Sequence, residues 1–250
     1  MKNTRFLLPN ALTLLNLLLG CVAIIIVFRG QNEYHASWFI FIAAVIDFLD
    51  GWVARLLNAK SGFGLQLDSL ADVVSFGVAP SIILFNWFDM ILTKMSKEGT
   101  YNWVSASFVQ NLILLSALLF AGGAAIRLAR FNSNENEDHY FRGLPTPAAA
   151  LVIASFWLII NTVNTWIGPL IWNLYFVAAV LLILVILMVS NLKMLNLKFT
   201  GFRLKNNFFR YLVILCSIVL IAVFRVEGII YAVLVYILVS LFVRSETVKA

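Results

Sequence analysis

The sequence predicts an all-α membrane protein, a polytopic bundle of about eight transmembrane helices. Hydrophobic residues make up 62% of the 250-residue chain and charged residues only 12%, against roughly 45–50% and about 25% in soluble domains. The mean hydropathy is +0.94, and the apolar residues form runs long enough to cross a bilayer as helices. No convincing cleavage site follows the first run, so we expect that helix to be retained.

We expect one helix at each of eight apolar runs. The runs lie at residues 9–28, 36–57, 66–92, 105–127, 145–166, 169–190, 208–224 and 226–243. The last two are short and nearly continuous, so a re-entrant hairpin stays an alternative to two full crossings. We expect residues 1–190 to form a six-helix core, and residues 191–250 to add a basic loop and two C-terminal helices.

Lysine and arginine set the orientation of the helices, because they are enriched in cytoplasmic loops. With a cytoplasmic N-terminus, only four of the 18 Lys and Arg residues fall outside: Arg29, Lys94, Lys97 and Arg225. We therefore expect a multi-pass plasma-membrane protein with both termini in the cytoplasm. This topology, with contact to anionic lipid headgroups, accounts for the net charge of +6 without a nucleic-acid partner.

Four aspartates stand inside the most apolar part of the chain. Asp47 and Asp50 are three residues apart in one predicted helix, and Asp68 and Asp72 are four apart in the next. On helices, each pair projects from one face. Each Asp inside a membrane costs roughly 2.5–3.5 kcal/mol, so four unpaired ones would cost on the order of 10–14 kcal/mol. The cluster therefore needs positive charge, from basic side chains or from divalent metal.

The residues around the aspartates favour metal and a phosphorylated ligand. A short loop joins the two helices, so the carboxylate pairs can face each other near the cytoplasmic edge and form an all-oxygen site suited to Mg²⁺ or Mn²⁺. Four carboxylates exceed the usual share of one Mg²⁺, which makes a two-metal phosphoryl-transfer site plausible. Gly51 and Ala54 remove bulk beside Asp47, and Arg55 can fork onto phosphate. Small residues alone would favour close helix packing instead.

Together these residues form a specific signature of eight positions over residues 47–72. It consists of Asp47, Asp50, Gly51, Ala54, Arg55, Gly64, Asp68 and Asp72. The signature resembles that of the CDP-alcohol phosphotransferase family without a departure at any position. The resemblance implies a polytopic membrane enzyme that transfers a phosphatidyl group from a CDP-linked lipid to a small alcohol and releases CMP.

Flanking segments narrow the resemblance. Residues 8–16, 69–80, 127–132 and 141–150 are similar to the membrane-integral phosphatidylserine synthase branch of the family. This branch implies CDP-diacylglycerol as the donor and L-serine as the acceptor, with CMP as a product. It also implies a homodimer. The resemblance covers about residues 5–160, and the rest of the chain adds little to it.

The resemblance also implies roles for individual residues. Asp47, Asp50 and Asp68 would hold two divalent cations, and Asp72 would contact the second and act as the general base. The residues implied at the CDP-lipid site are Asn10, Thr13, Gly51, Ala54, Arg55 and Ser61. Lys60 as a phosphate ligand and Lys60 as an ordinary cytoplasmic lysine stay equal alternatives.

The acceptor needs contacts of its own, because serine brings a carboxylate and an ammonium group. Arg127 and Arg130, at the cytoplasmic end of the fourth predicted helix, are the candidates for the serine carboxylate or a lipid phosphate. The alternative is that they are arginines that only set the topology.

Other functions stay open at this stage. The acceptor could be glycerol 3-phosphate, inositol phosphate or choline, or the donor could be an ether lipid. An ion or proton transporter would use the carboxylates as a relay, but a relay should be distributed across the bilayer, whereas these aspartates share one depth. A purely structural membrane protein would leave the aspartates unexplained.

Overall fold

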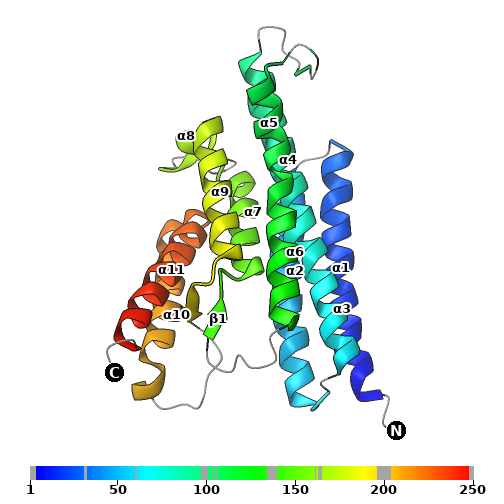
Figure 1. Cartoon of the computed structure of the whole chain (residues 1–250), viewed down its shortest axis with the longest axis vertical. Coiled ribbons are helices and arrows are strands. Elements are labelled where there is room, and N and C mark those ends of the chain that lie inside the picture. The colour runs from blue at the N-terminus through cyan, green and yellow to red at the C-terminus, as the bar shows by residue number, and fades with distance from the viewer. Residues whose placement is uncertain are drawn as a thin grey trace.

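The described residues fold into a bundle of helices with a small two-stranded sheet. The structure is a computed structural model that describes residues 4–30, 33–59, 61–96, 101–102, 104, 106–133, 140–160, 162, 165–195 and 204–247. Figure 1 shows the helices running mostly along the long axis of the molecule, with α5 and α8 towards the upper end and the start of α1 towards the lower end. The predicted all-α class is confirmed apart from the short sheet.

The helices follow the predicted runs closely. In chain order they are a 3₁₀ turn at Thr4–Phe6, α1 (Leu7–Phe28), α2 (Glu33–Leu56), α3 (Gly62–Val73), a π-helical segment (Val74–Val78), α4 (Ala79–Met95), α5 (Phe108–Ser116), α6 (Leu118–Ser133), α7 (Thr146–Ile160), α8 (Gly168–Ile171), α9 (Leu174–Val189), α10 (Leu204–Phe224) and α11 (Glu227–Thr247). Within the described residues, four helical segments are long and apolar enough to span a membrane, at 7–28, 62–95, 108–133 and 207–224. Three shorter apolar helices accompany them at 146–160, 174–189 and 227–242. The count of eight crossings stays a prediction.

Side-chain caps fix where several helices begin. Ser61 accepts a hydrogen bond from the Gly64 amide at 3.0 Å and so starts α3. Ser107 and Gln110 form a reciprocal capping box at the start of α5, and Asn173 caps α9. Such caps satisfy amide groups that have no partner inside the helix. The polar capping residues therefore set where α3, α5 and α9 begin, just before each apolar run.

Helix α1 packs against both α2 and α3. A Cβ on Gly20 would lie 2.5 Å from the Ser75 hydroxyl, so only glycine permits the close approach of α1 to the π-helical segment. There the Ser75 hydroxyl donates to the Asn16 carbonyl at 2.8 Å. The π-helical segment starts two residues after Asp72 and so lies beside the aspartates. Such segments in proteins are frequently found at functional sites.

A short antiparallel ribbon joins two segments that lie between predicted helices. Strand β1 (Tyr140–Arg142) pairs with β2 (Lys193–Leu195), with Arg142 opposite Lys193. The Gly143 amide extends the pairing by donating to Leu192 at 2.8 Å. The ribbon thereby ties the segment before α7 to the segment after α9.

The last two helices form a hairpin that packs against the rest of the bundle. Arg225 turns the chain between α10 and α11 with a φ of 52°. Helix α11 then contacts α7 and strand β2. The C-terminal hairpin (α10 and α11) is therefore part of the folded unit beside the ribbon.

Candidate active site

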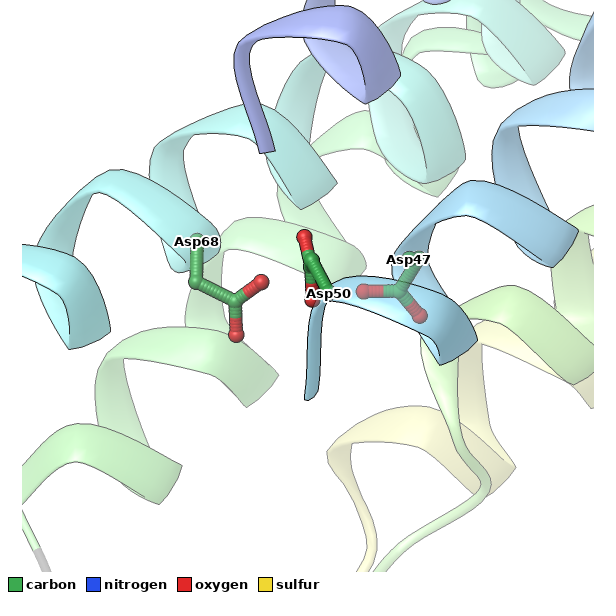
Figure 2. A group of neighbouring side chains, drawn as sticks. All are labelled: Asp47, Asp50 and Asp68. Atoms are coloured by element: carbon green, nitrogen blue, oxygen red, sulfur yellow. The ribbon is translucent and has the colours of Figure 1, made fainter. Parts of the chain in front are cut away.

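Three of the four aspartates meet between α2 and α3. Asp47 and Asp50 come from α2 and Asp68 from α3, and each offers a carboxylate oxygen within 4.8 Å of the other two. Figure 2 shows the three carboxylates turned towards one another across the space between the two helices. Asp50 is buried, whereas Asp47 and Asp68 are half-buried. Asp47 and Asp50 therefore face Asp68 across the two helices, as the short loop between them predicts.

Asp72 lies one turn after Asp68, and α1 supplies its hydrogen-bond donor. Its carboxylate is 8% exposed and lies beside Asp47. The Asn16 side-chain amide, itself fully buried, donates to Asp72 at 3.2 Å. The Thr13 hydroxyl similarly lies 2.9 Å from the Asp50 carboxylate. Helix α1 thus supports one aspartate of each pair.

The donor set fits divalent metal. All the converging atoms are carboxylate oxygens, the ligands that Mg²⁺ and Mn²⁺ prefer. The Asp68 Oδ1 atom is buried and has no hydrogen-bond partner among the described residues. An unpaired buried charged oxygen is costly, and a cation between α2 and α3 would satisfy it. The residues that could hold such an ion are Asp47, Asp50, Asp68 and Asp72.

The residues expected at the CDP-lipid site fall into two groups. Gly51 leaves space on α2: among the described residues, only the Arg55 guanidinium lies within 4 Å of the position a Cβ would take, at 3.7 Å. Arg55 itself is exposed, and Ala54 is half-buried one residue before it. These three residues lie on the last turns of α2, within a few residues of Asp50.

The second group gathers around the start of α3. A Cβ on Gly64 would lie 3.1 Å from Ser61 Oγ and 3.4 Å from Asn10 Oδ1, so α1 and α3 meet there. Ser61 serves as the cap of α3. Thr13, expected to face the CDP group, has its hydroxyl turned to Asp50. Lys60 lies outside the described residues.

The candidate acceptor arginines line a separate small cavity. It has a volume of about 220 Å³ and is lined by Arg127, Arg130, Phe131, Arg142, Met188, Val189, Ser190 and Asn191. Arg127 is buried and donates to the Thr146 hydroxyl at 3.2 Å, while its Nε has no hydrogen-bond partner among the described residues. Arg130 is exposed and donates to the Val189 carbonyl at 2.7 Å. We call this space the arginine cavity.

Sequence reasoning missed two of these residues. Asn16 belongs to a segment that the sequence marks only as flanking, and its contact with Asp72 bridges 56 positions. Arg142 precedes α7 with no local pattern that assigns it to a cavity, and the ribbon brings it there. The signal that could have indicated a role for Asn16 is its position as a polar residue in an otherwise apolar helix.

Residues 6–191 match the family model described as CDP-alcohol phosphatidyltransferase. The chain belongs to this family. Its members depend in general on divalent metal ions, which agrees with the acidic cluster between α2 and α3.

Named relatives within the CDP-alcohol phosphatidyltransferase family are similar over most of the chain. A CDP-diacylglycerol--serine O-phosphatidyltransferase from Helicobacter pylori is 36% identical over 206 residues, covering 81% of this chain and 78% of the relative. One from Methanocaldococcus jannaschii is 34% identical over 187 residues, covering 74% and 72%. An archaetidylserine synthase from Methanothermobacter thermautotrophicus is 36% identical over 160 residues, covering 63% and 60%.

Proposed function

We propose that this protein transfers the phosphatidyl group of CDP-diacylglycerol to the hydroxyl of L-serine and releases CMP, a step of phospholipid biosynthesis. The observation that carries this proposal is the convergence of four aspartates from α2 and α3 in a chain of the CDP-alcohol phosphatidyltransferase family. The serine acceptor is supported by relatives that are named for serine transfer and match most of the chain.

Asp47, Asp50 and Asp68 would hold two divalent cations, with Asp72 contacting the second. Bound there, the cations would neutralise the diphosphate and polarise the phosphorus under attack. The carboxylates themselves would fix the position of the donor headgroup relative to the bilayer edge. Their own mutual repulsion favours cation binding, because four carboxylates at close range need positive charge between them.

Asp72 is the proposed general base. A serine hydroxyl is a weak nucleophile at neutral pH, and a carboxylate within hydrogen-bond reach can take its proton as the new bond forms. The serine oxygen bonds to the phosphorus of the phosphatidyl group, and the bond from that phosphorus to the CMP oxygen breaks. Asn16 would orient the Asp72 carboxylate through its 3.2 Å hydrogen bond. Both substrates react directly, without a covalent enzyme intermediate.

The donor site would lie at the cytoplasmic ends of α1 and α2 and the start of α3. Gly51 and Ala54 would let the nucleotide approach the α2 backbone, and Arg55 would bind phosphate through its guanidinium fork. Asn10, Thr13 and Ser61 would contact the CDP group from the other side. The proximity of Asn10 and Ser61 around Gly64 supports this grouping.

The arginine cavity is the proposed acceptor site. Two observations on Arg127 support this: it lines the cavity, and it interacts electrostatically with Asp72. The Arg127 Nε is a buried donor with no hydrogen-bond partner in the described part of the chain, and a serine carboxylate or a lipid phosphate could satisfy it. Arg130 lines the same cavity and would supply a second guanidinium.

We further propose a plasma-membrane location with the site facing the cytoplasm, a homodimeric assembly, and a division into a core at residues 1–190 and a C-terminal part at residues 191–250. The positive-inside distribution of Lys and Arg supports the orientation. Family resemblance supports the dimer, and the extent of the family match supports the division.

CMP release tests the proposal. Purified protein is supplied with CDP-diacylglycerol, Mn²⁺ or Mg²⁺ and a panel of alcohols, and we expect release with serine that stops on metal chelation and returns when metal is restored. Release with another alcohol but not with serine would overturn the acceptor assignment and leave the reaction class. An absence of release with every alcohol would overturn the class as well.

The donor lipid is tested in the same assay. The similarity to an archaetidylserine synthase makes an ether-linked donor the specific alternative. Comparing ester- and ether-linked CDP lipids at equal concentration decides between the two, because the acceptor stays serine in both cases.

A further inference from the structure

Helix α11 holds strand β2 through two buried polar side chains. The Tyr236 hydroxyl donates to the Leu195 carbonyl at 3.1 Å, and the Leu195 amide donates to the Ser240 hydroxyl at 3.2 Å. Ser240 in turn donates to the Tyr236 carbonyl at 2.7 Å. Tyr236 and Ser240 are one helical turn apart, so they face β2 together. Between them they satisfy both backbone polar groups of Leu195.

Strand β2, which α11 holds, lies next to the wall of the arginine cavity, because it begins two residues after Asn191 and pairs with the strand that carries Arg142. Strand β2 pairs with β1, which ends at Arg142 opposite Lys193. Arg142 and Asn191 both line the cavity. A displacement of β2 would therefore move Arg142, which is one of the three cavity arginines, and the segment around Asn191.

Tyr236 also interacts electrostatically with one of the residues that line the cavity. Its hydroxyl is within electrostatic reach of the buried Arg127 guanidinium. Arg127 is in turn within electrostatic reach of Asp72. Electrostatic interactions thus link α11 through Arg127 to the proposed general base. Hydrogen bonds link α11 through the ribbon to Arg142.

Packing of α11 against the bundle does not by itself explain why Tyr236 and Ser240 carry buried hydroxyl groups. Burying a hydroxyl is unfavourable unless it forms a hydrogen bond, so an apolar side chain would suffice where only packing is needed. Tyr236 is 6% exposed and Ser240 is 2% exposed, and both use their hydroxyls on Leu195. Both also lie beyond residues 6–191, the part that the family model matches.

We propose that Tyr236 and Ser240 are positioning residues of the acceptor site, through which the C-terminal hairpin sets the shape of the arginine cavity for a small carboxylate-bearing alcohol. This inference rests on the proposed serine transfer. It assigns to α11 a part in acceptor recognition, whereas the proposed donor and metal residues lie on α1, α2 and α3 or, for Ser61, at the cap of α3.

Four single variants test the positioning role. Tyr236→Phe and Ser240→Ala each remove one hydroxyl, and Tyr231→Phe is the matched control. Tyr231 is on the same helix, and its ring lies against Phe224 of α10. For Tyr236→Phe and Ser240→Ala we expect the apparent KM for serine to rise roughly three- to tenfold, as the loss of one or two hydrogen bonds would give. The KM for CDP-diacylglycerol should stay within about twofold, and Ser240→Thr should restore the serine KM.

Hydrogen–deuterium exchange of the purified protein tests the contact independently of activity. Amide exchange at residues 140–144 and 192–195 should become faster in the Tyr236→Phe, Ser240→Ala double variant and stay unchanged in Tyr231→Phe. Unchanged exchange in the ribbon would overturn the positioning contact. Equal changes in the KM values for serine and CDP-diacylglycerol, or a lower kcat alone, would overturn the acceptor role. Such results would indicate a general effect of the substitutions on the fold.

The two proposals fail in different ways. If the wild-type protein releases no CMP with any alcohol, the proposed function fails and takes the acceptor role of α11 with it, while ribbon exchange still decides whether α11 holds β2. If the wild-type protein transfers to serine and Tyr236→Phe leaves the serine KM unchanged, only the inference about α11 is overturned.

Discussion

Asp68 is the aspartate whose surroundings point most directly to a bound cation. Its carboxylate converges with Asp47 and Asp50, and one of its oxygens is buried without a hydrogen-bond partner among the described residues. An amide in its place would keep the size of the side chain and remove the charge. The effect of such a change therefore reports on charge rather than on packing.

We expect Asp68→Asn to lower CMP release by at least about 100-fold, because the site loses one of its proposed metal-holding charges. The control is Asp89→Asn on α4, which changes a partly buried aspartate outside the cluster. It should keep activity near the wild-type level. An active Asp68→Asn protein, or equal losses in both variants, would count against the proposed role.

Asn16 offers a finer test, because it touches Asp72 without belonging to the acidic cluster. A hydrogen bond to a charged group contributes about 1.5–3 kcal/mol, so Asn16→Ala should lower kcat roughly ten- to 100-fold. The KM for the donor should change little if the amide only orients Asp72. Steady-state kinetics separate the two parameters, and an unchanged kcat would remove Asn16 from the reaction.

The residue scale also marks the limit of what spacing can predict. The spacing of Asp47 to Asp72 places two pairs of carboxylates on helix faces, because the helical period is local. The contact between Asn16 and Asp72 joins residues 56 positions apart. It depends on how α1 is rotated about its axis relative to α3. No local pattern encodes that rotation, so the donor to Asp72 could not be predicted.

At the scale of elements, the long apolar helices were predictable and the ribbon was not. The length of an apolar run in the sequence predicts the length of the helix. The observed α1 (Leu7–Phe28), for example, differs from the predicted 9–28 by two residues. Strands β1 and β2 have three residues each and lie about 50 positions apart. Neither shows a strand pattern by itself, and their pairing depends on α7 and α9 being already side by side.

Gly143 is the residue on which the ribbon depends most. Its φ is 74°, and a Cβ there would lie 2.3 Å from the Met188 carbonyl oxygen. A left-handed conformation costs a non-glycine residue about 1–2 kcal/mol, and the clash adds to this. We expect Gly143→Ala to lower the melting temperature in detergent by several degrees, since 1 kcal/mol corresponds to about 2–4 °C in a chain of this size.

The matched control for this substitution is Gly122→Ala in α6. Nothing described lies within 4 Å of the Cβ that it would add, and alanine in a helix is favoured over glycine by roughly 0.5–1 kcal/mol. Gly122→Ala should therefore melt at the wild-type temperature or slightly above it. Similar melting temperatures for the two variants would show that the backbone at Gly143 is less constrained than the structure indicates.

At the scale of the whole molecule, the proposed chemistry requires one orientation in the membrane. The aspartates, the arginine cavity and the ribbon all belong to the ends of helices that the charge distribution assigns to the cytoplasm. Soluble serine and CMP would then enter and leave from that side. The loop between α4 and α5 would face the opposite side of the membrane.

Cysteine labelling tests this orientation at two positions that tolerate a new side chain. A Cβ on Gly62, at the start of α3, would meet nothing described within 4 Å, and Val104, between α4 and α5, is 94% exposed. In a chain whose Cys21 and Cys216 are replaced by alanine, a membrane-impermeant maleimide should label Val104→Cys in intact cells. It should label Gly62→Cys only after permeabilisation, because that position is expected in the cytoplasm. The reverse pattern would invert the topology and place the proposed site away from cytoplasmic serine, whereas labelling of both positions in intact cells would mean that the helices between them do not separate two sides of a membrane.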